Sequence, residues 1–204
     1  MAEQEPVTPP APAVPKAPWE EKPVPPAPAD ARAHAQVVEI LDLLPDVVLA
    51  AVEFAGQVTV TVPHERIREV GRALKDRLGY TFLVDLTAVD WKERPEGRFD
   101  VVYWLHRFTD SRRLRLKVRV AEGIEVPSVV GVWKTANWME REVFDMFGVY
   151  FAEHPNLERI LTWEGFNGHP LRKDFPLEGI DTGAAIYPDV FPPGGGPVAG
   201  GEGE

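Results

Sequence analysis

Residues 98–120, RFDVVYWLHRFTDSRRLRLKVRV, predict a β-hairpin. The first half, 98–108, is rich in aromatic and β-branched residues, which are common in strands. In the second half, 112–120, leucines and valines alternate strictly with basic residues, which is the two-residue period of a strand with one buried face. The sequence TDS between the two halves favours a turn. We therefore expect two antiparallel strands, the second with one apolar and one basic face.

Helical and strand patterns continue on both sides of the hairpin. The expected elements are a helix at 31–44, two strands within 47–63 joined at 55–57, an amphipathic helix at 64–79, a strand at 80–91, the hairpin, and a helix at 133–147 before Gly148. The boundaries rest on hydrophobic periodicity and on proline or glycine at element ends. This order predicts an α+β fold, with a mostly antiparallel or mixed sheet and helices packed on one side.

Composition divides the chain into four parts. Ten of the 21 prolines precede Asp30, so residues 1–30 are expected to form a disordered arm rich in proline and alanine. Residues 31–150 are the predicted α+β domain. Residues 151–178 are apolar and aromatic but irregular, which favours an extended segment that wraps a partner protein. Residues 179–204 are expected to be a flexible tail rich in glycine and proline.

Charge and apolar runs restrict the class of protein. A net charge of −10 argues against a nucleic-acid binder. The longest apolar run, 47–52, is far shorter than the ~18–20 residues of a membrane helix, and the first residues do not resemble a signal peptide. We expect a cytosolic chain, or one held at a membrane through partners. The basic strand face is expected to meet acidic residues of this protein or of a partner, with nucleic acid as the less favoured alternative.

The stretch 139–148, MEREVFDMFG, concentrates charge on a predicted helix. At about 100° per residue, Glu142 and Asp145 lie on one side and Glu140 points away. No Glu-x-x-His spacing suggests a carboxylate-bridged metal site. We expect an ion pair between Arg141 and Asp145, four residues apart, and an ion-pairing or interface role for the cluster. A metal site and acid–base catalysis are the alternatives.

Other polar residues give weaker signals. His154 and His169 each precede proline, so we expect hydrogen-bonded turn histidines, with a two-histidine metal site as the alternative. Asp85 and Asp90 in the strand at 80–91 are expected to cap it and pair with an arginine. The sequence has no cysteine, no glycine-rich nucleotide loop and no G-x-S-x-G. Cysteine ligation of an iron–sulfur cluster is therefore excluded, and no nucleophile with its base is evident.

Residues 136–177 carry a resemblance to a known family. The motifs are Glu140-Arg141-Glu142, Asp145-Met146-Phe147, His154, Arg159-Ile160-Leu161, and GHPLRKDFPL at 168–177. Residues 82–91, FLVDLTAVDW, are similar to the central strand of the same family. Together they resemble the 30 kDa subunit, also called the C subunit, of the proton-pumping NADH:quinone oxidoreductase, respiratory complex I. The likeness covers about 31–178 and leaves out the proline-rich arm and the glycine-rich end.

This resemblance implies a component of the peripheral arm, on the cytoplasmic side of the bacterial inner membrane. Its C-terminal segment would embrace the D subunit beside the quinone-reducing module, with the B and I subunits as neighbours. The chain would carry no redox centre, so FMN, iron–sulfur clusters and quinone would belong to other subunits of the hetero-oligomer. Electron transfer and proton translocation would be activities of the whole complex. The alternatives are the equivalent subunit of a membrane-bound hydrogenase or another quinone- or ferredoxin-linked complex, or a stand-alone metal-dependent enzyme.

We therefore expect no catalytic, cofactor-binding or metal residue in this chain. The candidate residues are structural or lie at a partner interface: Glu140, Arg141, Glu142, Asp145, His154, Arg159, Trp163, Phe166, His169, Arg172, Lys173 and Asp174. The charged residues of the segment would anchor it on the partner. Trp163 and Phe166 would be its apolar anchors, because aromatic residues dominate interface energetics.

Overall fold

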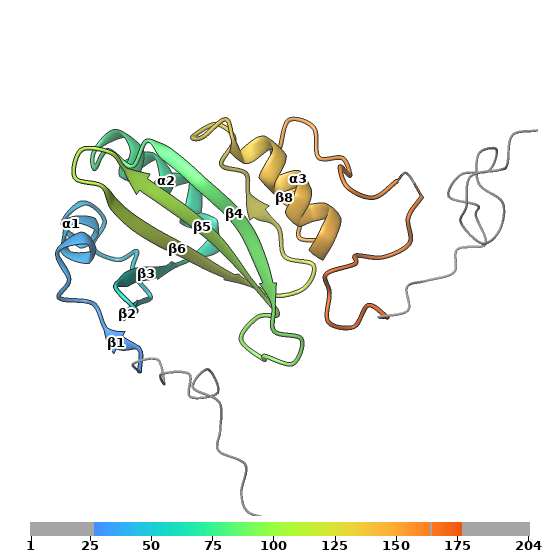
Figure 1. The fold of residues 1–204 in the computed structure, drawn as a ribbon, viewed down its shortest axis with the longest axis horizontal. Helices are drawn as coiled ribbons and strands as arrows, with labels where there is room; N and C mark the ends of the chain where they lie inside the picture. The colour runs from blue at the N-terminus through green and yellow to red at the C-terminus, as the bar shows by residue number, and fades with distance from the viewer. Residues whose placement is uncertain (1–26, 164, 177–204) are drawn as a thin grey trace, which may run out of the picture.

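A computed structural model describes residues 27–163 and 165–176 of the chain and shows an α+β domain (Figure 1). The elements are β1 (Ala29–Asp30), α1 (Ala35–Leu43), β2 (Ala50–Phe54), β3 (Gln57–Val62), the 3-10 helix η1 (His64–Arg66), α2 (Ile67–Asp76), β4 (Phe82–Asp90), β5 (Phe99–Arg107), β6 (Arg112–Val120), β7 (Val126–Pro127), α3 (Ala136–Phe147) and β8 (Phe151–Ala152). The predicted α+β class is therefore confirmed.

The main sheet has six strands in the order β1-β2-β3-β6-β5-β4. All neighbouring pairs are antiparallel except β3 and β6, which are parallel, so the sheet is mixed. The predicted hairpin is confirmed as β5 and β6, whose register runs from Phe99 opposite Val120 to Arg107 opposite Arg112. After β3 the chain forms α2 and then β4 at the far edge of the sheet. The hairpin of β5 and β6 fills the space between, so β6 lies beside β3.

Alternation along the hairpin decides which face of the sheet is buried. The inward residues of β6, from Leu114 to Val120, are at most 2% exposed, and so are Phe99, Val101, Tyr103 and Leu105 of β5. One cluster joins these side chains to buried residues of α1, α2 and α3. The helices therefore pack on this face, and Figure 1 shows α2 behind the strands. The basic residues of β6 lie on the opposite face.

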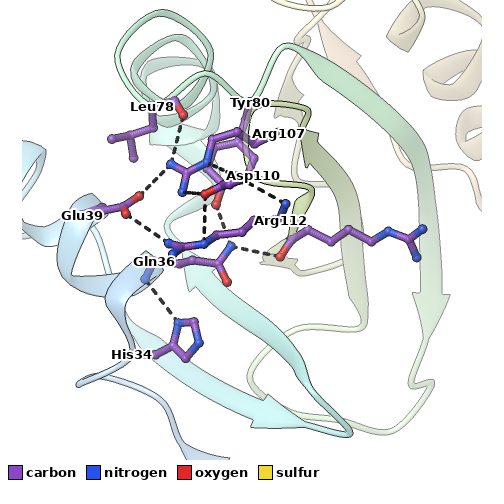
Figure 2. Close-up of polar contacts among 9 residues, drawn as sticks. His34, Gln36, Glu39, Leu78, Tyr80, Arg107, Asp110 and Arg112 are labelled. Atoms are coloured by element: carbon purple, nitrogen blue, oxygen red, sulfur yellow. Dashed lines mark hydrogen bonds and ion pairs between the residues drawn. The ribbon is translucent and has the colours of Figure 1, made fainter.

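A buried arginine fastens helix α1 to the hairpin turn (Figure 2). Arg107 donates to Glu39 at 2.8 Å and to Asp110 at 2.7 Å, and its guanidinium carbon lies 5.1 Å from the centre of the Tyr80 ring. Gln36 on the same helix donates to the Tyr80 hydroxyl at 2.6 Å. These contacts fix α1 although few of its residues reach the core.

The element boundaries differ from the predicted ones at several places: α1 and α2 are shorter than the helices predicted at 31–44 and 64–79, and the latter range begins with η1. Helix α3 begins at Ala136, not at 133, because the amides of Val132 and Trp133 bond to the Val129 carbonyl in a separate turn. Its predicted end is correct, since Gly148 has φ of +73° and caps the helix in the left-handed region. Strand β1 pairs with β2 and occupies the last two residues of the range predicted as the arm.

Candidate functional site

Asp145, in the last turn of α3, is the centre of a hydrogen-bond network, and its side chain accepts five hydrogen bonds. Its side chain is fully buried. One carboxylate oxygen accepts from the backbone amides of Ile160, Leu161 and Thr162 at 2.8–3.0 Å. The other accepts from Arg159 at 2.8 Å and from the Thr162 hydroxyl at 2.5 Å. Burial alone would raise the pKa of Asp145, but these donors outweigh it and hold the pKa at about 2.

The segment after β8 also covers the free carbonyls at the C-terminal end of α3. His169 Nδ1 lies 2.9 Å from the Asp145 carbonyl, the Leu171 amide donates to Met146, and Arg172 donates to Phe147 at 2.5 Å. A carbonyl only accepts, so Nδ1 of His169 carries the proton. Burial lowers the pKa of this histidine, which is therefore neutral at pH 7. The last turn of α3 and residues 159–163 and 165–172 form one unit, which we call the α3 latch.

The expected ion pair between Arg141 and Asp145 is wrong. Arg141 donates to the carbonyls of Glu158 and Arg159 at 3.0 and 3.2 Å and stacks over Trp138. Asp145 takes its cation from Arg159 instead. The helical spacing allows the predicted pair, but Asp145 faces the interior while Arg141 lies toward the surface, where it meets the returning chain.

The three acidic residues of the α3 stretch have three different surroundings. Glu140 is fully buried and accepts from the Ser128 hydroxyl and the Val129 amide, each at 2.7 Å. Burial raises its pKa to about 7, although both donors act in the opposite direction. Glu142 is exposed and Asp145 is buried in the α3 latch. Glu142 and Asp145 are three residues apart on one continuous helix, as expected, but only Asp145 is buried, so the two carboxylates have no common partner in the described chain.

His154 is a turn histidine, as expected. Its Nδ1 accepts from the Asn156 amide at 3.1 Å, so Nε2 carries the proton and faces the Asn137 carbonyl at 3.1 Å. Burial lowers its pKa. The nearest Glu140 oxygen is 3.9 Å from Nε2, too far for a hydrogen bond. Within residues 27–163 and 165–176, no three His, Asp or Glu side chains are placed to hold a metal ion.

A second network attaches the segment to the edge of the sheet. Asp90 accepts from Arg98 at 2.9 and 3.0 Å and from the Lys173 amide at 2.9 Å. Burial opposes ionisation of Asp90, yet these donors lower its pKa well below the ordinary value. Arg98 also pairs with Asp174 at 2.8 Å. The expected pairing with an arginine is confirmed for Asp90, whereas the Asp85 side chain accepts from the Leu86 amide at 2.9 Å instead. In the described chain Arg172, Lys173 and Asp174 all contact the chain's own domain.

The predicted aromatic anchors lie at the surface of the latched segment. The Trp163 and Phe166 rings meet edge to face at 4.7 Å, and Phe166 stacks on Phe175 at 5.9 Å. Trp163 is 39% exposed, and Leu161 and Leu171 are more than half exposed. Apolar side chains on a segment held this firmly are typical of an interaction surface.

Ser128 and Gly148 are important residues of the site that sequence patterns do not identify. Ser128 lies twelve residues before Glu140, and no local pattern links them. For Gly148 the sequence predicts only a helix end. A Cβ there would lie 2.5 Å from side-chain atoms of His169 and Arg172, so glycine also makes room for the latch. The sequence signal for this second role is the position of Gly148 before the two histidine–proline pairs, at 154–155 and 169–170.

The fold and site define an α+β domain whose C-terminal segment is fastened to its last helix and presents aromatic side chains. Residues 60–181 match the family described as "Respiratory-chain NADH dehydrogenase, 30 Kd subunit". The chain therefore belongs to the family of the 30 kDa subunit, the C subunit, of NADH-quinone oxidoreductase, or respiratory complex I. The resemblance found from the motifs is confirmed.

Relatives of the chain carry the name of this same subunit. The C subunit of NADH-quinone oxidoreductase from Phenylobacterium zucineum is 55% identical over 61% of this chain and 59% of its own length, so the chain spans about three fifths of that relative. The C subunit from Geobacter metallireducens is 45% identical over 73% of this chain and 93% of its own length. A chain of the membrane-bound sulfane sulfur reductase, an archaeal respiratory membrane complex, is similar in structure, with a TM-score of 0.62, 27% identity, and coverage of 72% of this chain and 86% of that one.

None of the helices in the described ranges is long and apolar enough to cross a membrane.

Proposed function

We propose that this chain is a non-redox structural component of the peripheral arm of NADH:quinone oxidoreductase, and that its C-terminal segment docks on the D subunit. In this role it stabilises the quinone-reducing module beside the B and I subunits. It lies on the cytoplasmic side of the inner membrane and reaches the membrane through the complex. FMN, iron–sulfur clusters and quinone belong to other subunits, and oxidoreduction with proton translocation belongs to the assembled enzyme.

The observation that carries this proposal is the α3 latch. It holds an irregular segment in one conformation by five hydrogen bonds to Asp145, while Leu161, Trp163 and Leu171 remain exposed. A segment that is ordered before it binds loses less conformational entropy on association. Family membership supplies the kind of partner, and the absence of cysteine from the sequence agrees with a non-redox role.

A pair of substitutions in the aromatic surface tests the docking role. Trp163→Ala with Leu161→Ser should lower the amount of complex that co-purifies with the D subunit, because both exposed apolar contacts are lost. Activity per assembled complex should stay at the wild-type level, since neither residue touches a reacting group. Leu49→Ala is the matched control, because Leu49 is 56% exposed and lies outside the segment. Normal amounts of complex with the double variant would overturn the proposal.

The likeness to the archaeal complex favours one second candidate, the equivalent subunit of a related membrane-bound complex such as a hydrogenase. The identity of 45–55% to the C subunit of NADH-quinone oxidoreductase is well above the 27% identity to the archaeal chain, which favours the first candidate. Purification of a tagged chain decides between them. A co-purifying flavin- and NADH-binding subunit supports the first, and a nickel-binding large subunit supports the second.

A further inference from the structure

The face of the sheet opposite the helices carries an excess of positive charge. Arg113, Arg115, Lys117 and Arg119 project from β6 on this side, and we call them the basic row. Asp100 on β5 lies 3.4 Å from both Lys117 and Arg119, but it also accepts two hydrogen bonds from Arg94. A single carboxylate is therefore shared among three cations. No ion pair joins Arg113 or Arg115 to any carboxylate in the part of the chain that the structure describes.

Arg115 has no anionic partner among the described residues, and its side chain is held in one orientation. Its guanidinium carbon lies 3.9 Å from the centre of the Trp104 ring, which holds the side chain flat on the sheet. Its Nε is buried and has no hydrogen-bond partner among those residues, and burial lowers the pKa of the group. Removing a cation from water without a paired anion is unfavourable, so a bound carboxylate would stabilise it.

On the same face of the sheet, two further buried polar atoms without partners in residues 27–163 and 165–176 lie on the flanking strands. They are Oε1 of Gln57 on β3 and Nδ1 of His106 on β5. The register pairs His106 with Arg113, and it pairs Thr59, two residues after Gln57, with Arg115. The three unpartnered atoms therefore belong to residues on the same face of three neighbouring strands. Such groups are uncommon in folded proteins, and a cluster of them indicates a surface that completes its hydrogen bonds on binding.

Aromatic and aliphatic side chains border this polar cluster. Phe108 lies edge to face with His106 at 4.6 Å and beside Phe82 at 5.7 Å. Phe108 is 64% exposed, and Phe82 and Val84 on β4 are more than 40% exposed. A stacked guanidinium beside exposed aromatic rings suits a carboxylate with apolar neighbours in the partner.

We propose that this face of the sheet, centred on Arg115 and Trp104, is a second docking surface that binds an acidic segment of a neighbouring subunit, with a carboxylate seated on the Arg115 guanidinium. The inference rests on the proposed function, because it requires a multi-subunit complex. It concerns the opposite side of the domain from the helical face and makes no use of the α3 latch. Charge complementarity selects the occupant: the basic row, and the Arg115 Nε that has no partner among the described residues, favour carboxylates of another subunit.

Zero-length cross-linking in the purified complex tests this surface. Arg115→Lys keeps the charge and introduces an amine that a carbodiimide joins to any carboxylate in contact with it. We expect mass spectrometry to find residue 115 joined to an aspartate or glutamate of another subunit. Arg72→Lys, on the exposed side of α2, is the control that should give no such product. Cross-links only to residues of this same chain, or none in an intact complex, would overturn the proposal.

A protection measurement on the wild type keeps the test independent of the variant. Lys117 should be acetylated at least tenfold more slowly in the complex than in the full-length chain purified alone, whereas the exposed Lys134 serves as reference. Equal rates for Lys117, or protection that nuclease treatment removes, would overturn the inference.

The Trp163→Ala and Leu161→Ser variant tests the C-terminal segment independently of this surface. A cross-link from residue 115 with unimpaired docking of that double variant refutes only the role of the C-terminal segment, and the converse refutes only this surface.

Discussion

Replacing Asp145 by asparagine should release the α3 latch while leaving the rest of the domain folded. Asparagine has the same shape, but it has no charge and offers only one oxygen to five donors. Arg159 and the amides of 160–162 then lose charge-assisted hydrogen bonds, which are among the strongest in proteins. The core does not contain this segment, so the change is expected to be local.

The magnitude follows from the pKa of Asp145. The carboxyl group titrates at about 2 in the fold, against an ordinary value of 3.8. A difference of roughly two units corresponds to about 2.5 kcal/mol between the ionised and neutral forms. In Asp145→Asn the free energy that favours the closed latch should fall by about that amount. The equilibrium constant for opening should therefore rise about 70-fold.

Hydrogen exchange of the full-length chain measures this opening. The amides of 160–162 should exchange about 70-fold faster in Asp145→Asn, whereas those of β5 and β6 should be unchanged. Glu142→Gln is the control, because Glu142 is exposed on the same helix. Because the pKa is depressed in the fold, the wild-type latch is fully stabilised above about pH 5 and weakens as pH falls from there to about 2. Unchanged exchange in the variant, or a latch insensitive to pH in this range, would refute the reasoning.

Three other substitutions probe separate parts of the structure. Gly148→Ala should lower the free energy of unfolding by about 2 kcal/mol, because its φ is +73° and a Cβ would crowd the latch; Gly131→Ala, where a Cβ meets open space, is the control in thermal unfolding. Glu140→Gln should stabilise the chain at pH 8 by up to about 3 kcal/mol and have little effect near pH 4.5. The pKa of Glu140 is raised from 4.5 to about 7, so the wild type loses stability as pH rises from about 4.5 to about 7; denaturant midpoints at the two pH values check this. Asp90→Ala should cost about 3 kcal/mol in the same assay, because Arg98 loses a buried partner, and a loss below about 1 kcal/mol would contradict that account.

Local sequence patterns predict the fold well where one physical signal dominates. Strict alternation in 112–120 defines the bounds of β6 and its buried face, because a strand with one buried side has no other register available. The start of α3 is harder to predict because Val132 and Trp133 match a helical period while belonging to a turn closed by the Val129 carbonyl. Periodicity reports burial, and a buried turn next to a helix produces the same signal.

The candidate site could be predicted as a set of residues but not as a set of contacts. Asp145 and Arg159 are both candidates from the sequence, yet helical spacing favours Arg141 as the partner because it lies four residues away. The real partner lies fourteen residues away and is brought in by the return of the chain. The contact of Asp90 with the Lys173 amide spans 83 residues and involves main chain on one side. Side-chain patterns carry no information about such a bond.

The α3 latch also bears on how this part of the protein can evolve. Three of the five donors to Asp145 are main-chain amides, which every residue except proline provides. Leu161 can therefore change its side chain freely without loosening the attachment. The attachment and the presented surface are thus under separate selection: one aspartate preserves the path of the chain, while the residues displayed along it are free to follow changes in a binding partner.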